Sequence, residues 1–123
     1  MSAFVYLFRA SATEMRAAMR PEQAQQSLQA MMAWFKDLEQ QGYLKNPGLP
    51  LEPAGRVVSG KGGVISDGPY AETKDMVLGF IVIEARDMAQ AIELARTCPM
   101  VTGGAAVEIR PVGQSTESRI AKE

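Results

Sequence analysis

The side chains best suited to chemistry in this chain are gathered in one short segment, residues 66–74. It contains the carboxylates Asp67 and Glu72 and the amine Lys74. Carboxylates can act as general acids or bases, and a lysine can bind an anionic group. Arg9, which follows an apolar segment near the N-terminus, could hold a carboxylate through two parallel hydrogen bonds. The candidate catalytic residues are therefore Asp67 and Arg9, and the candidate ligand-binding residues are Gly68, Pro69, Tyr70, Glu72 and Lys74.

Each of these candidates also has a structural interpretation. Asp67 precedes a Gly-Pro pair, and an Asp in such a corner commonly binds backbone N–H groups. Glu72 and Lys74 are equally compatible with a solvated loop, and Arg9 with a structural ion pair. Tyr70 can line a pocket or pack in a core or an interface. The sequence leaves both interpretations open for every one of these residues.

The absence of histidine restricts the chemistry further. With no His and a single cysteine, Cys98, a structural zinc site and a Cys-His or Ser-His-Asp device are excluded. The segment Gly60-Lys61-Gly62-Gly63 lacks the spacing of a phosphate-binding loop and predicts a hairpin turn instead. We expect no metal and no cofactor.

Composition indicates one domain that binds neither nucleic acid nor membrane. The 123 residues carry a net charge of −1, whereas a nucleic-acid or anionic-membrane surface requires a basic excess. No apolar run approaches the length of a bilayer span, and the apolar N-terminal segment is too short for a signal peptide. A single cysteine fits a reducing compartment. We expect a cytoplasmic protein.

Hydrophobic periodicity predicts a mixed series of helices and strands. Strands are predicted at residues 4–8, 56–59, 63–66, 78–84 and 106–112. Helices are predicted at residues 13–19, 21–41 and 87–98, and a proline-rich loop at 43–53. Residues 1–112 are taken as the domain, and 113–123 as a polar, flexible tail.

The two longer predicted helices each show an apolar face. In the first, the residues that recur at helical spacing are Ala24, Leu28, Met31, Phe35 and Leu38, flanked by Met32 and Trp34. Pro21 suits its first turn and Gly42 the position after its end. In the second, the face consists of Met88, Ala91, Ile92, Ala95 and Cys98. Asp87 is its capping residue, with Gln90 in a capping box, and Pro99 ends it.

This order of elements predicts an α+β, ferredoxin-like β-α-β-β-α-β fold with an extra central hairpin. Two helices can cover only one face of the sheet, yet the strands at 4–8 and 78–84 are apolar on both faces. A patch of that size is not expected on a monomer. The sequence therefore predicts a two-fold homodimer, sheet on sheet, with pockets between the sheets and their loops.

The segment Asp67-Gly68-Pro69-Tyr70-Ala71-Glu72-Thr73-Lys74 resembles the hallmark of the DGPF, or YCII-related (YciI-like), domain family, in which the fourth residue is usually Phe. The other matching segments include Leu7-Phe8-Arg9, Leu51-Glu52-Pro53, Val57-Val58-Ser59-Gly60-Lys61-Gly62, Gly79-Phe80 and Gly103-Gly104. The resemblance covers residues 3–112. It implies a dimeric α+β barrel, in agreement with the dimer predicted above.

The resemblance implies less about activity. YciI-like relatives are thought to be small-molecule enzymes with a His–Asp pair, and some related barrels act on aromatic ring compounds. Because this chain has no histidine, only the turn at Asp67 can be carried over by position. Three hypotheses follow: a small-molecule enzyme of the isomerase, lyase or hydrolase type in the dimer cleft, a non-catalytic ligand-binding module, or a regulatory protein that binds another chain. The sequence does not decide whether the protein is an enzyme.

Overall fold

The structure of the protein is a computed structural model, which describes residues 1–18, 20–68 and 75–113. The elements run in the order β1 (Ser2–Ser11), α1 (Ala12–Ala18), α2 (Pro21–Gln40), β2 (Leu44–Pro50), β3 (Gly55–Ser59), β4 (Val64–Gly68), β5 (Asp75–Ala85), α3 (Met88–Arg96), α4 (Pro99–Thr102) and β6 (Ala106–Pro111). Residue 19, the segment 69–74 and residues 114–123 of the predicted tail lie outside the described residues. The flexibility of that tail stays a prediction.

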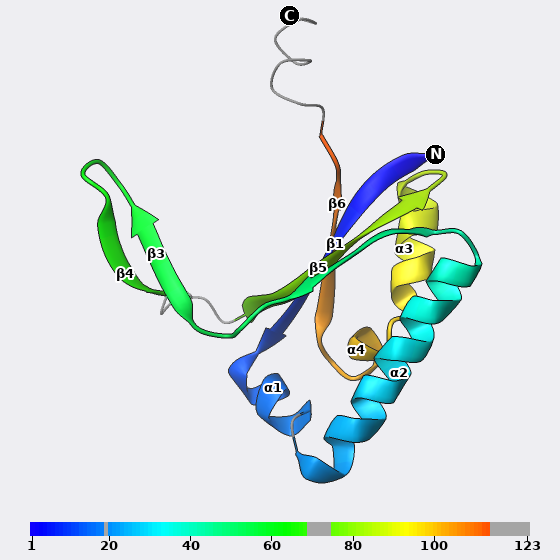
Figure 1. Cartoon of the computed structure of the whole chain (residues 1–123), viewed down its shortest axis with the longest axis horizontal. Coiled ribbons are helices and arrows are strands. Elements are labelled where there is room, and N and C mark those ends of the chain that lie inside the picture. The colour runs from blue at the N-terminus through cyan, green and yellow to red at the C-terminus, as the bar shows by residue number, and fades with distance from the viewer. Residues whose placement is uncertain (19, 69–74, 114–123) are drawn as a thin grey trace, which may run out of the picture.

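Four of the strands form one antiparallel sheet in the order β2-β5-β1-β6, and β3 pairs with β4 in a separate hairpin (Figure 1). The helices α2 and α3 follow β1 and β5 along the chain, so the expected α+β class and ferredoxin-like arrangement are confirmed. Among the described residues, no helix is both long and apolar enough to cross a bilayer.

The prediction of a loop at residues 43–53 is wrong, because this segment contains the edge strand β2. The prolines that argued against a strand are tolerated at a sheet edge, where one side needs no ladder hydrogen bonds. The ladder to β5 is irregular here, and the Gly48 N–H donates to Asn46 Oδ1 at 2.8 Å. Gly48 has φ of +60°, and a Cβ on it would overlap the Phe80 carbonyl oxygen. Only glycine permits so close an approach of the two backbones.

The core lies between one face of the sheet and the helices. Alternate residues of β1 are buried, namely Phe4, Tyr6, Phe8 and Ala10. The Trp34 ring of α2 stacks on Tyr6, with ring centres 6.3 Å apart, and meets Phe8 edge-on at 6.2 Å. The Tyr6 hydroxyl donates to the Ala91 carbonyl oxygen of α3, and Trp34 Nε1–H donates to Thr97 Oγ1 at 2.8 Å. These bonds satisfy the polar atoms that the aromatic core buries.

The apolar face predicted for α2 is only partly correct. Leu38 is buried, but Leu28 is 61% exposed and the flanking Trp34 is buried instead. The reason is that only the second half of α2 packs on the core, whereas its first half lies beside α1, beyond the sheet (Figure 1). Gly42 follows the helix with φ of +82°, as expected of a residue just past a helix end.

The apolar face predicted for α3 is also partly correct, since Ala91 and Ala95 are buried but Met88 and Ile92 are exposed. Asp87 Oδ1 accepts from the Gln90 N–H at 2.9 Å, and Gln90 Oε1 accepts from the Arg86 N–H at 2.7 Å. Cys98 is fully buried, as predicted. The helix ends before Pro99, which then starts the short helix α4.

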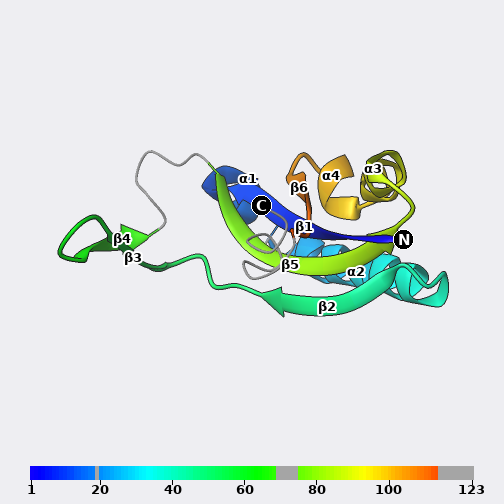
Figure 2. The same cartoon turned by 90° about the horizontal axis from the view of Figure 1, so that it is seen from above.

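The hairpin of β3 and β4 extends away from the four-stranded sheet (Figures 1 and 2). Its turn lies at residues 60–63, as predicted. The apolar side chains Val58, Val64 and Ile65 on it are between 63% and 68% exposed. A two-stranded hairpin is marginally stable by itself in water.

Candidate functional sites

The face of the sheet opposite the helices carries apolar residues flanked by charges. Val5 pairs with Val82 and Leu7 with Phe80, and all four side chains are only half-buried. At the edge strand beside them, Leu49 is 65% exposed. We call this surface, formed by Val5, Leu7, Leu49, Phe80 and Val82, the open sheet face.

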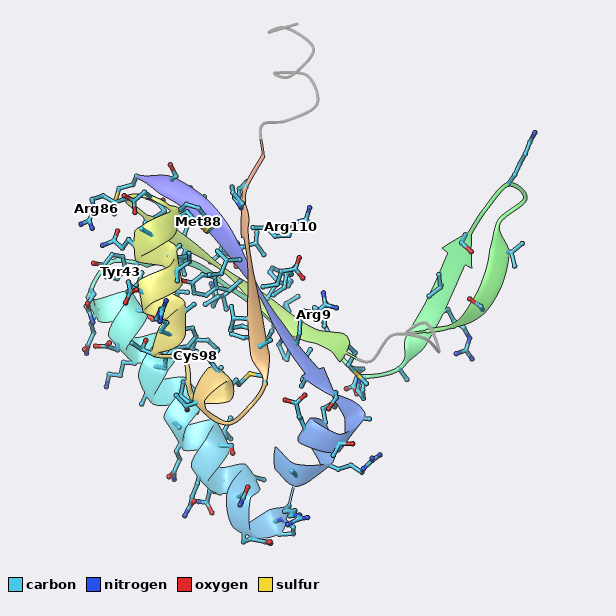
Figure 3. The ribbon with its side chains drawn as sticks, turned by 180° about the vertical axis from the view of Figure 1, so that it is seen from behind. Arg9, Tyr43, Arg86, Met88, Cys98 and Arg110 are labelled. Carbon is cyan, nitrogen blue, oxygen red and sulfur yellow. The ribbon has the colours of Figure 1, made fainter. Side chains whose placement is uncertain are left out.

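Arg9 lies on this face, paired with a carboxylate. Its Nη1 donates to Glu108 Oε1 at 2.7 Å, and the two side chains are 31% and 38% exposed. Figure 3 shows Arg9 and Arg110 on the side of the sheet away from α2 and α3. The structural ion pair that the sequence left open is therefore formed, and the guanidinium already has an anionic partner.

The other predicted site residues are not brought into a described site. Asp67 and Gly68 form the end of β4, and the backbone of Asp67 pairs with that of Arg56 in β3. The strand thus runs two residues further than predicted. Pro69, Tyr70, Glu72 and Lys74 lie outside the described residues. The catalytic or capping role of Asp67 and the ligand-binding role of its neighbours stay predictions.

Sequence reasoning missed a cavity on the opposite, helix-covered side of the sheet. It has a volume of about 600 Å³ and lies among α1, α2, α4 and the adjoining ends of β1 and β5. This volume falls in the range of small-molecule sites, roughly 300–1,000 Å³. Its apolar wall includes Ala10, Met15, Ala30, Met31, Leu78 and Met100.

Local structure explains why the space is unfilled. Several of the residues that face it from β1, α2 and the segment before β6 are small, namely Ala10, Ala30, Gly103 and Ala105. The β1–β5 register also shifts between Phe8 and Arg9, so that β5 has one additional residue at this point, Leu78. That residue lines the cavity. Small side chains on facing elements leave a gap that neighbouring backbones do not close.

Glu14 is the charged residue among those that line the cavity. Its Oε1 accepts from the Ser11 N–H at 3.0 Å, and its own N–H donates to Ser11 Oγ at 3.1 Å. This is a capping box at the start of α1. Hydrogen bonds from the Ser11 backbone N–H and hydroxyl lower the pKa of the Glu14 carboxyl. The group is therefore an anion at neutral pH.

The buried titratable groups of the core are poorly suited to catalysis. Burial raises the pKa of the Cys98 thiol and, as the largest cause, that of the Tyr6 hydroxyl. A thiol that stays protonated is a weak nucleophile. Among the described residues, no three Cys, Asp or Glu side chains come together to hold a metal ion.

The sequence did contain a signal for the polar part of this site. Ser11 and Glu14 are three residues apart in the sequence, which is the spacing of a capping box, and the first predicted helix starts at residue 13, between them. The apolar wall carried no comparable signal, because its residues come from five separate elements.

The chain matches the sequence profile of the YCII-related domain over residues 4–114. It belongs to the YCII-related domain family. A search of curated proteins gave no match. A solved structure similar to this family member is 5-chloro-2-hydroxyhydroquinone dehydrochlorinase (TftG) from Burkholderia phenoliruptrix AC1100, in complex with 2,5-dihydroxybenzoquinone. The two are 13% identical, the alignment covers 95% of this chain and 98% of the other, and the TM-score is 0.49.

Proposed function

We propose that this YCII-related protein binds a small organic molecule in the cavity among α1, α2 and α4. The observation that carries the proposal is the cavity itself, whose volume of about 600 Å³ and mainly apolar wall match those of small-molecule sites. The cavity lies on the helix side of the sheet, so the residues of one chain suffice to form it.

Binding without turnover is the function that the described side chains favour. The lowered pKa of Glu14 makes it a weak proton acceptor, because an efficient general base has a pKa near the working pH. The neighbouring polar residues that line the cavity are Thr13, Gln23, Gln26 and Ser27. They can donate and accept hydrogen bonds, which is sufficient to orient a ligand.

A small-molecule enzyme in a dimer cleft is the second candidate. It is favoured by Arg9 and Glu108, which form a half-exposed pair of opposite charges on the open sheet face. In this proposal Asp67 supplies the base. Replacement of Asp67 by Asn would then abolish turnover while the melting temperature stayed unchanged; a lower melting temperature without any loss of turnover would assign Asp67 to the turn.

We also propose that two copies associate through the open sheet face as a two-fold dimer. Support comes from the half-buried apolar side chains of Val5, Leu7, Phe80 and Val82 on β1 and β5, which a second sheet would cover. The exposed valines and isoleucine of the β3–β4 hairpin would gain contacts in the same assembly. A cytoplasmic location is proposed because the one cysteine, Cys98, is a free buried thiol.

The binding proposal can be tested with a neutral fluorescent probe, N-phenyl-1-naphthylamine, whose emission rises in apolar surroundings. Ala30 lines the cavity from α2, whereas Ala33 is exposed on the same helix and is absent from the lining. We expect Ala30→Phe to weaken probe binding roughly tenfold or more by filling the cavity, and Ala33→Phe to leave it unchanged. Equal affinity of both variants and the wild type would contradict the proposal.

A further inference from the structure

We propose that the cavity selects molecules that combine an apolar body with a protonated amine, and that Glu14 Oε2 is the anchor for the amine. This inference rests on the proposed function, since it names the class of ligand for the same cavity. It goes further because it assigns a charge to the ligand and a binding role to one atom.

The two carboxylate oxygens of Glu14 are in different situations. Oε1 is occupied by the Ser11 N–H in the capping box. A carboxylate can accept about four hydrogen bonds, and Ser11 supplies two donors to this one, its backbone N–H and its hydroxyl. Oε2 lies near Gly104, and a Cβ at that glycine would meet it at 3.7 Å, an ordinary van der Waals distance.

The capping box also fixes the position of the carboxylate. Ser11 binds Glu14 at its backbone N–H and at its Oε1, and the second bond restricts the side-chain rotamers before any ligand arrives. A ligand that binds such a preorganised group avoids the entropic cost of ordering it. This distinguishes Glu14 from the exposed glutamates of α2, such as Glu22.

The rest of the wall favours a cation with an apolar body. Among the described residues that line the cavity, Glu14 is the sole charged one, so no fixed cation there competes with the ligand. The thioethers of Met15, Met31 and Met100 and the side chain of Leu78 form an apolar surface around it. A ligand that joins a cation to an apolar body would therefore contact both the carboxylate and this apolar surface.

Three probes that share one ring system test the inference by calorimetry: 2-naphthylmethylamine, 2-naphthylmethanol and 2-naphthoate. We expect the wild type to bind the amine most tightly, the alcohol more weakly, and the carboxylate about tenfold or more weakly than the amine. Each probe is also expected to displace N-phenyl-1-naphthylamine, and Ala30→Phe to weaken all three.

The decisive variant is Glu14→Gln, with Glu22→Gln as its matched control. Glutamine can replace glutamate in a capping box, so the fold is retained while the charge is removed. We expect Glu14→Gln to bind the amine about tenfold more weakly and the alcohol with little change, and Glu22→Gln to behave as the wild type.

The outcomes separate this inference from the proposed function. If the three probes bind the wild type equally, or if Glu14→Gln binds the amine as tightly as the wild type, the selection by charge is wrong while the cavity remains a binding site. If none of the three binds and N-phenyl-1-naphthylamine does not bind either, the proposed function fails and the inference fails with it. A preference for the carboxylate would assign the opposite charge to the ligand.

Discussion

Ser11 and Glu14 are joined by two hydrogen bonds at the point where β1 passes into α1. The Ser11 N–H donates to Glu14 Oε1 at 3.0 Å, and the Glu14 N–H donates to Ser11 Oγ at 3.1 Å. The pair satisfies two N–H groups at the start of the helix. It also places a carboxylate at the wall of the cavity, so one local motif both starts a helix and supplies the charged group of the candidate site.

The first prediction concerns the capping side chain. Ser11→Ala removes the acceptor of the Glu14 N–H and is expected to lower the free energy of unfolding by about 1 kcal/mol. Urea denaturation measures the change. Ser11→Thr should restore most of the stability, because threonine also caps helices. Ser27→Ala, at an exposed position inside α2, is the control and should have little effect. Equal stability of Ser11→Ala and the wild type would mean that the box does not stabilise α1.

The second prediction concerns the pH dependence of the same pair. The pKa of Glu14 is lowered in the folded chain from its ordinary value of 4.5 by the hydrogen bonds from Ser11. A lowered folded pKa means that the ionised form stabilises the fold. That stability is fully present above the ordinary pKa and is lost as the pH falls through the folded pKa.

Comparison of the wild type with Glu14→Gln tests whether the ionised carboxyl stabilises the fold. The free energy of unfolding of the wild type should fall more steeply than that of the variant as the pH is lowered below 4.5. Parallel pH profiles would show that the carboxylate contributes no pH-dependent stability.

The third prediction concerns association through the open sheet face. Leu7 is half-buried on β1 between Phe80 of β5 and Glu108 of β6. In a sheet-on-sheet dimer its side chain would be enclosed, and Leu7→Asp would place an unpaired charge in an apolar interface. Sedimentation velocity should show a dimer for the wild type and a monomer for Leu7→Asp.

A matched control is Leu28→Asp, because Leu28 is 61% exposed on α2, away from the open face. It should remain dimeric. Because the cavity lies on the helix side, the Leu7→Asp monomer should still bind N-phenyl-1-naphthylamine. A wild type that sediments as a monomer at all concentrations would contradict the dimer without affecting the binding proposal.

The fourth prediction concerns Arg9 and Glu108. The pair has good geometry, with Nη1 and Oε1 2.7 Å apart, but both side chains are about one-third exposed. Solvent screening reduces the value of such a pair to between about 0.2 and 1 kcal/mol. A double-mutant cycle with Arg9→Ala and Glu108→Ala should give a coupling free energy in that range. A larger value would indicate that the pair becomes enclosed in the assembled protein.

Several parts of the structure were predictable because their causes are local. The Asp87 cap, Gly42 after α2 and the hairpin turn at 60–63 follow from the conformational preferences of a few neighbouring residues. The alternation of Tyr6 with Leu7 on β1 likewise indicated a strand with two apolar faces, and the structure buries one of them beneath the helices.

Other parts depended on neighbours that the sequence does not identify. The sequence predicts a loop where β2 lies, because prolines fit a strand only in special positions such as a sheet edge. Gly48 fits there because its backbone lies against the carbonyl of Phe80. Trp34 rather than Leu28 is buried on α2 because the sheet reaches only the second half of that helix.

The candidate site shows the same division. The sequence by itself determined the cap of Ser11 and Glu14, the absence of histidine chemistry and the family of the chain. Only the tertiary structure decided that Arg9 pairs with Glu108 and that a cavity opens beside Glu14. The physical reason is the separation of the residues along the chain. A cap is made by residues three positions apart, whereas a cavity exists only where small side chains from distant segments meet across unfilled space.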